Sequence, residues 1–276
     1  MIQNLIELTK VRIGFLVLTT TVIGFYLGAQ GSFSSSLLLY TIIGTLFSST
    51  GGSIINNVIE VDSDKNMDRT KHRVLPTKKI SVKFALFLGL SILYLKVNTL
   101  TALLSMLTIA LYLLVYTPLK RVSWINTSIG AIPGAIPPLG GWTAATNSLD
   151  LGGIALFLIL FFWQHPHFYA IAFMYRDDYA KAGLKMLPVV DNGIKRTVLH
   201  IFLHALILIP ISTLPFFFGV SGRVYFVGAY LLSNIYMLCC LPFILEQSRE
   251  NASLIFKTSI YYFPLLFFLI LADLFI

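Results

Sequence analysis

The sequence predicts an all-α integral membrane protein. Its nine transmembrane helices are expected to form two pseudo-repeated groups of four, plus one, around a central cavity open to the cytoplasmic side. Of the 276 residues, 57% are hydrophobic and only 12% are charged, whereas a soluble globular protein carries about 25% charged residues. The apolar residues gather into stretches near the ~20 residues that a helix needs to cross a bilayer. Loops rich in Lys and Arg alternate with loops that almost lack them.

Nine apolar stretches are expected to be helices of one transmembrane domain covering residues 1–276. In chain order they are 12–29, 36–59, 80–96, 98–117, 122–145, 151–174, 197–220, 223–245 and 256–275. The third stretch is the shortest and carries Lys83 near its start. The first lacks a cleavage signature, so it is interpreted as a retained helix rather than a signal peptide.

The basic residues predict how the helices are oriented. The N-terminus, the loops after the second, fourth, sixth and eighth stretches and the helix ends that adjoin them hold 18 of the 20 Lys and Arg residues; the other side has only Lys96 and Arg223. Because Lys and Arg are enriched in cytoplasmic loops, we expect a cytoplasmic N-terminus and a C-terminus across the plasma (inner) membrane. The net charge of +8 therefore reflects orientation and gives no support for a nucleic-acid partner.

Four carboxylates within nine residues follow the second stretch, and topology does not explain them because acids contribute little to orientation. If this helix continues, an amide and three carboxylates recur every four residues: Asn56, Glu60, Asp64 and Asp68. The first three would share one helix face. Such an oxygen-rich corner is what Mg²⁺ prefers, with substrate phosphates completing its coordination.

Cations follow this corner and would suit phosphate charge: Lys65, Arg69, Lys71 and Arg73. The alternative interpretation is a solvated loop with internal ion pairs, each worth little. The four-residue register and the preceding Gly51-Gly52 pair, which would let a neighbouring backbone approach, leave the two interpretations about equal.

A second cytoplasmic loop, after 151–174, repeats the mixture of acids and cations with Asp177, Asp178 and Lys181. Asp62 and Asp178 are 116 residues apart, and each follows the second helix of a group of four. Internal repeats are common in membrane folds, with the site between the repeats. The spacing therefore predicts two related halves that face one cavity.

Three further features lie near the expected inner rim. Tyr116, Lys120 and Arg121 place a phenol and two cations after the fourth stretch. Glycines and prolines interrupt 122–145, which must be buried in protein or line a cavity because lipid cannot satisfy freed backbone groups. The run from Trp163 to His167 places Gln164, His165 and His167 inside a span.

Polar residues inside a span are costly and point to function, although a single membrane histidine also serves interhelical hydrogen bonds. His200 and His204, one turn apart, fit a second ligand pair and interhelical hydrogen bonds equally. Together these features predict a membrane cavity with a Mg²⁺–diphosphate site at its mouth. A lipid-soluble diphosphate would ionise there to a carbocation that a second substrate captures.

Five ordered runs resemble motifs of the intramembrane aromatic prenyltransferases, and within them the branch that acts on protohaem IX. They are Asp64-x-x-Met67-x-Arg69-Thr70, Tyr116-Thr117-x-Leu119-Lys120-Arg121, Gly134-Ala135-x-Pro137-Pro138-x-x-Gly141-Trp142, Trp163-Gln164-x-Pro166-His167-Phe168 and Asp177-Asp178-Tyr179-x-x-Ala182-Gly183. The resemblance covers nearly the whole chain. It implies Mg²⁺-dependent transfer of a farnesyl group from farnesyl diphosphate to a vinyl group of protohaem IX (haem B), with water addition giving haem O. It also implies membrane lipid around the enzyme and, as partners, the next haem-modifying enzyme or oxidase assembly factors.

The resemblance also implies residue roles. The implied metal ligands are Asn56, Glu60, Asp64, Asp177 and Asp178. The implied diphosphate-binding residues are Arg69, Arg73, Lys120 and Arg121. The implied catalytic residues are Asn56, Glu60, Asp64, Tyr116 and Lys120. His167 is the expected haem iron ligand, because imidazole is a common axial ligand, with Trp163 and Gln164 beside it.

The chain departs from the superfamily pattern at both acidic motifs. Asn57 and Glu60 stand at positions that are Asp in the superfamily, and Tyr175 and Tyr179 replace the outer acids of the second motif. The alternative function is a prenyltransferase acting on a phenolic quinone precursor, but a phenol acceptor gives no reason for the histidines in 151–174. A secondary transporter would place its coupling acids near the midplane, whereas the acids here gather at the inner rim.

Overall fold

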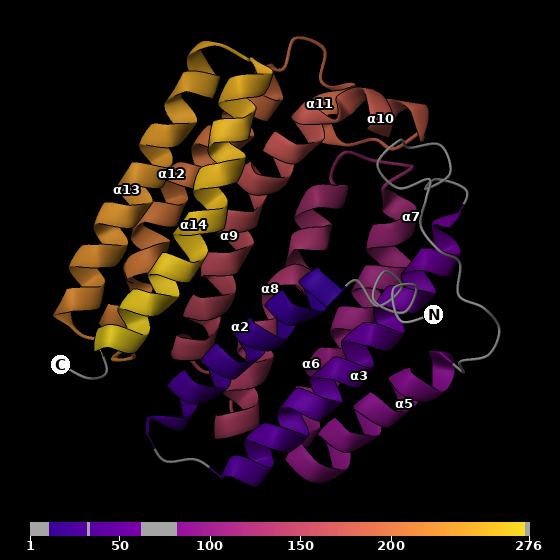
Figure 1. Ribbon diagram of the computed structural model, residues 1–276, viewed down its shortest axis with the longest axis vertical. Helices are drawn as coiled ribbons and strands as arrows, with labels where there is room; N and C mark the ends of the chain where they lie inside the picture. The colour runs from indigo at the N-terminus through magenta and orange to yellow at the C-terminus, as the bar shows by residue number, and fades with distance from the viewer. Residues whose placement is uncertain (1–10, 32–33, 62–81, 274–276) are drawn as a thin grey trace.

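The computed structural model describes residues 11–31, 34–61 and 82–273. Every regular element in these ranges is helical, so the all-α prediction is confirmed for the described part of the chain. The long helices lie beside one another in a broad array (Figure 1).

The first half of the chain supplies one side of the array. Its elements are α2 (Val11–Ala29), α3 (Ser35–Ile59), α5 (Val82–Ile92), η1 (Leu93–Val97), α6 (Thr99–Ala110), η2 (Leu111–Tyr116), α7 (Thr117–Leu119) and α8 (Asn126–Thr146). The elements η1 and η2 are π-helical turns that continue α5 and α6. α3 packs on α5, and α2 packs extensively on α8.

The second half forms a bundle of four long helices. Its elements are α9 (Leu151–Met174), α10 (Arg176–Lys181), α11 (Leu187–Val190), α12 (Lys195–Phe217), α13 (Arg223–Leu245) and α14 (Arg249–Asp273). α9 contacts α12 and α14, and α13 lies between α12 and α14. Short α10 and α11 lie at one end of this bundle (Figure 1). Most of the buried hydrophobic core belongs to this half.

Each predicted stretch corresponds to a helix, with three larger errors at the ends. The fifth helix begins at Asn126 rather than at residue 122, because the chain turns over residues 120–125. The seventh helix ends at Phe217 rather than at residue 220, because the chain turns at Gly219, whose φ is +70°. The ninth begins at Arg249 rather than at residue 256, because its first turns are polar; the side chain of Ser248 accepts from the Asn251 N–H there.

Six described helices are long and apolar enough to cross a membrane by length and composition. They are Ser35–Ile59, Thr99–Leu119, Leu151–Met174, Lys195–Phe217, Arg223–Leu245 and Arg249–Asp273. Ile13–Ala29 and Phe84–Val97 are apolar but shorter. The nine-span count therefore remains a prediction.

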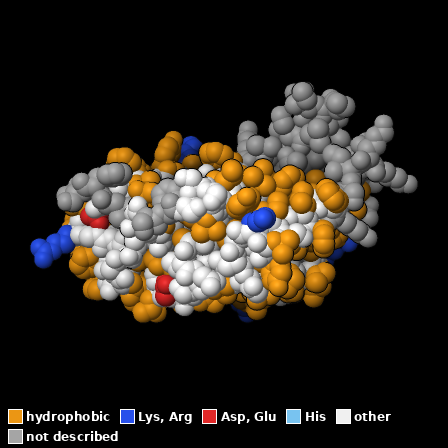
Figure 2. All heavy atoms as spheres, turned by 90° about the horizontal axis from the view of Figure 1, so that it is seen from below, with side chains coloured by type: hydrophobic (Ala, Val, Ile, Leu, Met, Phe, Trp, Pro, Cys, Tyr) orange, Lys and Arg blue, Asp and Glu red, His pale blue; other side chains and the backbone are white. Residues whose placement is uncertain are grey.

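The surface agrees with a lipid environment. Seen from below in Figure 2, hydrophobic side chains gather around the outer edge and few charged ones appear. Large side chains that would be unfavourable in water are also more than 70% exposed, such as Phe15, Phe87, Leu95 and Leu114. Contiguous exposed apolar surface of this kind marks contact with a membrane or a partner.

Close backbone contacts fix α8 in the middle of the array. A Cβ atom on Gly24 of α2 would collide with the Pro138 carbonyl, and one on Gly141 of α8 with the Thr21 carbonyl. α8 is largely buried despite its three internal prolines, and it lines a cavity. The prediction that this interrupted helix is buried or lines a cavity is confirmed.

Glycine has the same role between α3 and α5. A Cβ atom on Gly51 would lie 2.9 Å from the backbone nitrogen of Leu86, so the predicted close approach at Gly51 is confirmed. Gly52 faces the Ile109 side chain at 3.7 Å, an ordinary contact.

Candidate functional site

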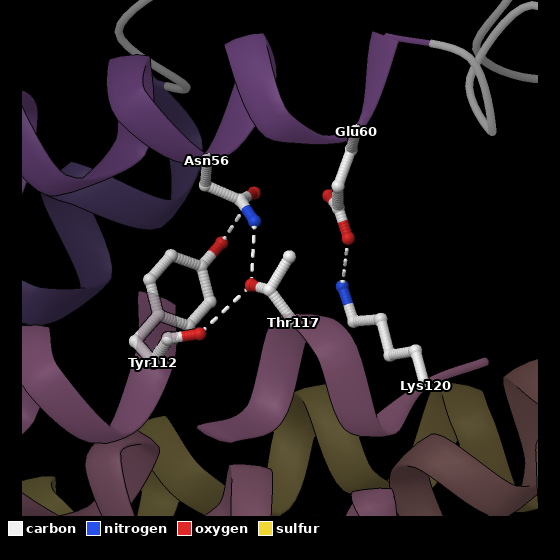
Figure 3. Close-up of polar contacts among 5 residues, drawn as sticks. All are labelled: Asn56, Glu60, Tyr112, Thr117 and Lys120. Carbon is white, nitrogen blue, oxygen red and sulfur yellow. Dashed lines mark hydrogen bonds and ion pairs between the residues drawn. The ribbon is translucent and has the colours of Figure 1, made fainter. Parts of the chain in front are cut away.

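The C-terminal end of α3 faces η2 and α7, and polar side chains join the two segments (Figure 3). Asn56 is fully buried. Its Oδ1 accepts a hydrogen bond from the Tyr112 hydroxyl at 2.8 Å, and its Nδ2 donates to Thr117 Oγ1 at 3.0 Å. Thr117 Oγ1 in turn donates to the Tyr112 carbonyl at 2.8 Å. The orientation of the Asn56 amide is therefore set by side chains of the facing segment.

One turn beyond Asn56, Glu60 caps α3 and forms an ion pair with Lys120. The Lys120 Nζ lies 2.5 Å from Glu60 Oε1, and both side chains are less than 15% exposed. The same Nζ lies 4.3 Å from the centre of the Tyr116 ring. Three of the predicted catalytic residues, Glu60, Tyr116 and Lys120, are thus brought together.

The surroundings of Lys120 keep its ammonium charged. Burial alone would lower the pKa of Lys120, but Tyr116 and Glu60 act in the opposite direction and raise it above its ordinary value of 10.5. A buried cation held by one carboxylate and one aromatic face suits an incoming anion.

The π-helical turn η2 explains why the tyrosines line up here. Tyr112 and Tyr116 stack with ring centres 5.8 Å apart, so one ring reaches Asn56 and the other lies against Lys120. Isolated π-turns inside α-helices occur frequently at functional sites. Sequence reasoning missed Tyr112 and Thr117. The four-residue spacing from Tyr112 through Tyr116 to Lys120 is a signal that would have found the first.

Part of the predicted magnesium corner lies outside the described residues. These residues are Asp62, Asp64, Lys65, Asp68, Arg69, Lys71 and Arg73. Regular α3 ends at Ile59, with Glu60 as its cap. Among the described residues, no group of three His, Cys, Asp or Glu side chains is placed to hold a metal ion.

The donor chemistry still fits Mg²⁺. Glu60 supplies a nearly buried carboxylate that a single ammonium neutralises, and Mg²⁺ typically takes one or two carboxylates together with phosphate oxygens. Asn56 differs from Glu60, because its amide oxygen already accepts a hydrogen bond within the protein.

The second acidic motif divides into an inward and an outward residue. Asp178 is 17% exposed and lies 3.9 Å from Lys181, whereas Asp177 is 89% exposed and lies 3.8 Å from Arg176. Both stand in the first turn of α10, where a negative charge is favourable for any helix. Burial therefore distinguishes Asp178 as the better ligand candidate.

Backbone contacts tie this second loop to the first site. The Lys185 N–H donates to the Lys120 carbonyl at 2.7 Å, and Asn126 Nδ2 donates to the Lys185 carbonyl at 2.9 Å. Arg121, the neighbouring predicted phosphate ligand, is exposed. The loop after α10 thus lies against the residue that pairs with Glu60.

The predicted haem residues separate into two groups. His167 and Trp163 stack with ring centres 5.1 Å apart, and both contact Ser259 of α14: His167 through Nδ1 at 2.6 Å, and Trp163 Nε1 by donating to its carbonyl at 3.0 Å. Gln164 points instead toward α8, where Gly134 makes room for its side chain. The two aromatic residues lie together, and Gln164 lies apart from them.

The other histidines gather between α9 and α12. The His165 ring lies 3.9 Å from that of His204, which stacks in turn on His200. His165 also reaches Ser128 of α8 at 3.1 Å, whereas His204 Nδ1 bonds the His200 carbonyl in its own helix. Stacking and hydrogen bonding therefore account for His165 and His204, whereas the buried Nδ1 of His200 has no hydrogen-bond partner in the described part of the chain. No metal-binding group is found among the described residues.

A cavity lies between α2, α3, α6 and α8. Its α3 residues, Thr45, Ser48 and Ser49, precede Asn56 in the chain. The cavity contains about 440 Å³ of empty space, part of it open to the surroundings. Its lining includes Val17, Thr21, Thr45, Ser48, Leu93, Ser105, Ile109 and Ile136. Several of the lining hydroxyls bond backbone carbonyls of their own helices. These hydroxyls therefore already have partners within the protein, which suits an apolar occupant.

Comparison with known proteins gives a family match across most of the chain. Residues 17–270 match the model of the UbiA prenyltransferase family. The chain is 42% identical to the Protoheme IX farnesyltransferase of Solibacter usitatus (strain Ellin6076), over 98% of each chain. It is 38% identical to the Protoheme IX farnesyltransferase of Aquifex aeolicus (strain VF5), over 94% of this chain and 91% of that one.

Solved structures match the fold. A structure described for digeranylgeranylglyceryl phosphate synthase superposes with a TM-score of 0.83 at 18% identity, covering 99% of this chain and 98% of that one. A UbiA homolog from Archaeoglobus fulgidus bound to GPP and Mg²⁺ gives 0.65 at 17% identity, covering 97% and 99%. At these identities the likeness shows a shared fold.

Proposed function

Because the chain belongs to the UbiA prenyltransferase family, we propose that it is a membrane enzyme that transfers a farnesyl group from farnesyl diphosphate to a vinyl group of protohaem IX. The observation that carries this proposal is the 38–42% identity to proteins named Protoheme IX farnesyltransferase over nearly the whole chain. Water addition completes the reaction and gives haem O. Six long apolar helices make the chain an integral membrane protein.

In the proposed reaction, the bond between C1 of the farnesyl group and the diphosphate oxygen breaks, and its electron pair leaves with diphosphate. The vinyl π electrons form the new carbon–carbon bond to C1, which leaves a cation on the vinyl carbon beside the porphyrin ring. Water adds to that carbon and releases a proton. The electrostatic task of the enzyme is to stabilise the leaving diphosphate and the cation.

The described site supplies the first part of this task. Mg²⁺, held by Glu60 with Asp64 and Asp178, would neutralise diphosphate charge. Lys120 would bind phosphate oxygens with its ammonium, which Glu60 positions and whose pKa is raised. The other proposed diphosphate ligands are Arg69, Arg73 and Arg121. Asp177, which is largely exposed, is proposed to contribute charge without a direct metal bond.

The farnesyl chain is proposed to extend from this site into the cavity between α2, α3, α6 and α8. Its lining is mostly apolar or internally hydrogen-bonded. Tyr112 and Tyr116 belong to η2, which continues the cavity helix α6, and Tyr116 lies against Lys120, so the farnesyl chain is proposed to pass these rings as it leaves the diphosphate site.

Protohaem is proposed to bind near α9 and α14, with His167 as the iron ligand and Trp163 stacked against it. Gln164 is proposed to contribute from the side of α8, toward which its side chain points. We propose a cytoplasmic N-terminus, an inner-membrane location and a site that faces the cytoplasm, because 18 of the 20 basic residues lie on that side by sequence. The product would pass to a further haem-modifying enzyme or to oxidase assembly factors.

The decisive experiment supplies purified protein in detergent with protohaem, farnesyl diphosphate and Mg²⁺, and reads pigments by mass spectrometry. The expected product is haem heavier by one farnesyl group and one water, and it should be lost in Asp64→Ala. Prenylation of a hydroxybenzoate or naphthoate with unmodified haem would show that the acceptor is a phenolic quinone precursor instead. No transfer to either acceptor by folded protein would overturn the proposed activity.

A further inference from the structure

Ser259 of α14 lies opposite His167 of α9, and its hydroxyl makes two short contacts. Its Oγ is 2.6 Å from His167 Nδ1 and 2.6 Å from the Phe256 carbonyl. From this arrangement we infer that Ser259 is a positioning residue, which holds His167 with its proton on Nδ1 and presents the lone pair of Nε2 to the haem iron. The inference rests on the proposed function.

The proton count determines the direction of both hydrogen bonds. A serine hydroxyl has one proton, and a backbone carbonyl has none to give. The contact between Ser259 and Phe256 therefore requires the hydroxyl proton. Ser259 Oγ must then accept from His167 Nδ1, which places the imidazole proton on Nδ1. In the neutral ring the other nitrogen, Nε2, carries the free lone pair.

The ring is held in orientation as well as in tautomer. Trp163 stacks on His167 with an interplanar angle of 22°, and its indole N–H is fixed to the Ser259 carbonyl. Phe256 and Phe168 lie within 5.3 Å of the His167 ring, measured between ring centres. Ser259 therefore orients both members of the stack, one through its side chain and one through its backbone.

Comparison with the neighbouring histidines sharpens this assignment. Both ring nitrogens of His165 have partners, the Phe161 carbonyl and the Ser128 hydroxyl. His204 has only Nδ1 engaged among the described contacts, with a carbonyl of its own helix. His204 is thus the rival iron ligand, and its hydrogen bond does not involve α14. Ligating histidines commonly donate their second N–H to such a partner, whose loss costs about 10- to 100-fold in metal affinity.

The test compares Ser259→Ala with Ser259→Cys and a matched control, Ser233→Ala. Ser233 is also fully buried in this bundle and bonds the Ala229 carbonyl and Tyr262, without contacting His167. Cysteine keeps the side-chain size but is a weaker hydrogen-bond partner. The probe is ferrous protohaem, read by resonance Raman at the iron–histidine stretch and by titration for affinity.

In Ser259→Ala, we expect the iron–histidine stretch to move to lower frequency and haem affinity to fall about 10- to 100-fold, while the KM for farnesyl diphosphate is unchanged. Ser259→Cys should show a smaller shift of the iron–histidine stretch. It provides the same test if the alanine variant does not fold. Ser233→Ala should match the wild type, and His167→Ala should abolish the band.

Two results would overturn the inference while leaving haem farnesylation intact. One is a wild-type stretch and affinity in both folded Ser259 variants. The other is a band that survives in His167→Ala and disappears in His204→Ala. Absence of haem turnover in the wild type would instead refute the proposed function itself.

Discussion

The Nζ atom of Lys120 lies 2.5 Å from Oε1 of Glu60, and this pair joins the end of α3 to the segment after α7. The partners are 60 residues apart in the sequence. One belongs to the predicted metal corner and the other to the predicted phosphate-binding cations. The structure thus places one residue of the expected metal corner and one of the expected phosphate-binding cations in direct contact.

Replacing Lys120 by Met should lower kcat about 100-fold, because it removes a preorganised cation from the leaving diphosphate. The matched control is Lys96→Met, since Lys96 also lies over a tyrosine ring, that of Tyr40 at 6.0 Å, but is predicted to lie on the opposite side of the membrane. Product formation at saturating substrate is the measurement. Equal activity in the two variants would contradict the role of Lys120.

The Glu60–Lys120 pair should also leave a pH signature in stability. Since the pKa of Lys120 is raised above 10.5, the stabilisation is complete below that pH and is lost as the pH rises through the folded-state pKa. The free energy of unfolding should exceed that of Lys120→Met by about 2 kcal/mol near neutral pH. Thermal unfolding in detergent should show a constant difference from pH 7 to 10 that shrinks at higher pH. A difference that shrinks already between pH 7 and 9 would contradict this.

Magnesium removal should abolish transfer, and restoring Mg²⁺ should recover it. Glu60→Gln keeps the shape of the side chain but removes its charge, so the Mg²⁺ concentration for half-maximal activity should rise at least about 10-fold. Product formation across a Mg²⁺ titration measures this. An unchanged Mg²⁺ requirement in Glu60→Gln would remove Glu60 from the metal site.

Tyr112→Phe removes the hydroxyl that donates to Asn56. A hydrogen bond of this kind contributes about 1 kcal/mol, so the unfolding temperature should fall and the KM for farnesyl diphosphate should rise several-fold as the end of α3 loosens. Tyr116→Phe keeps the ring against Lys120 and should leave the unfolding temperature unchanged. The interpretation fails if both variants unfold at the wild-type temperature.

Adjacent glycines of α8 provide a packing test. Gly141→Ala should destabilise the protein by about 1–3 kcal/mol, because its Cβ would collide with the Thr21 carbonyl of α2. At Gly140 a Cβ meets nothing within 4 Å, so Gly140→Ala should be neutral or stabilising through helix propensity. The change in unfolding temperature relative to the wild type should therefore differ in sign or size between the two variants. Equal changes would contradict the close α2–α8 contact.

The positions and lengths of the helices could be predicted from the sequence, because a helix that crosses a bilayer needs an apolar stretch of about 20 residues. Leu151–Met174 and Arg223–Leu245 were predicted to the residue. Ends set by local backbone geometry were not, as at Gly219, where a positive φ ends the turn. The π-turns were also missed, since nothing in an apolar run distinguishes one extra residue per turn from a regular helix.

Site residues could be predicted where charged residues stand in an unusual pattern. Their hydrogen-bond partners could not be predicted where these lie far away in the sequence. The register of Asn56 and Glu60 suggested a metal corner, yet the Asn56 amide is bonded to Tyr112 and Thr117. Residue type pointed to His167, but its link to Ser259 crosses 92 residues. Gln164 shows the limit: it follows Trp163 directly, and helical geometry turns it toward another neighbour.

The contacts of Lys185 have a consequence for how the enzyme is made. Its backbone binds the Lys120 carbonyl and the Asn126 side chain, which is 59 residues earlier. The ribosome therefore synthesises the segment that contains Lys120 well before Lys185, which contacts it, exists. If Lys120 binds phosphate as proposed, we expect catalytic competence to arise only after the residues beyond α9 have been made, so a product truncated before Lys185 should be inactive.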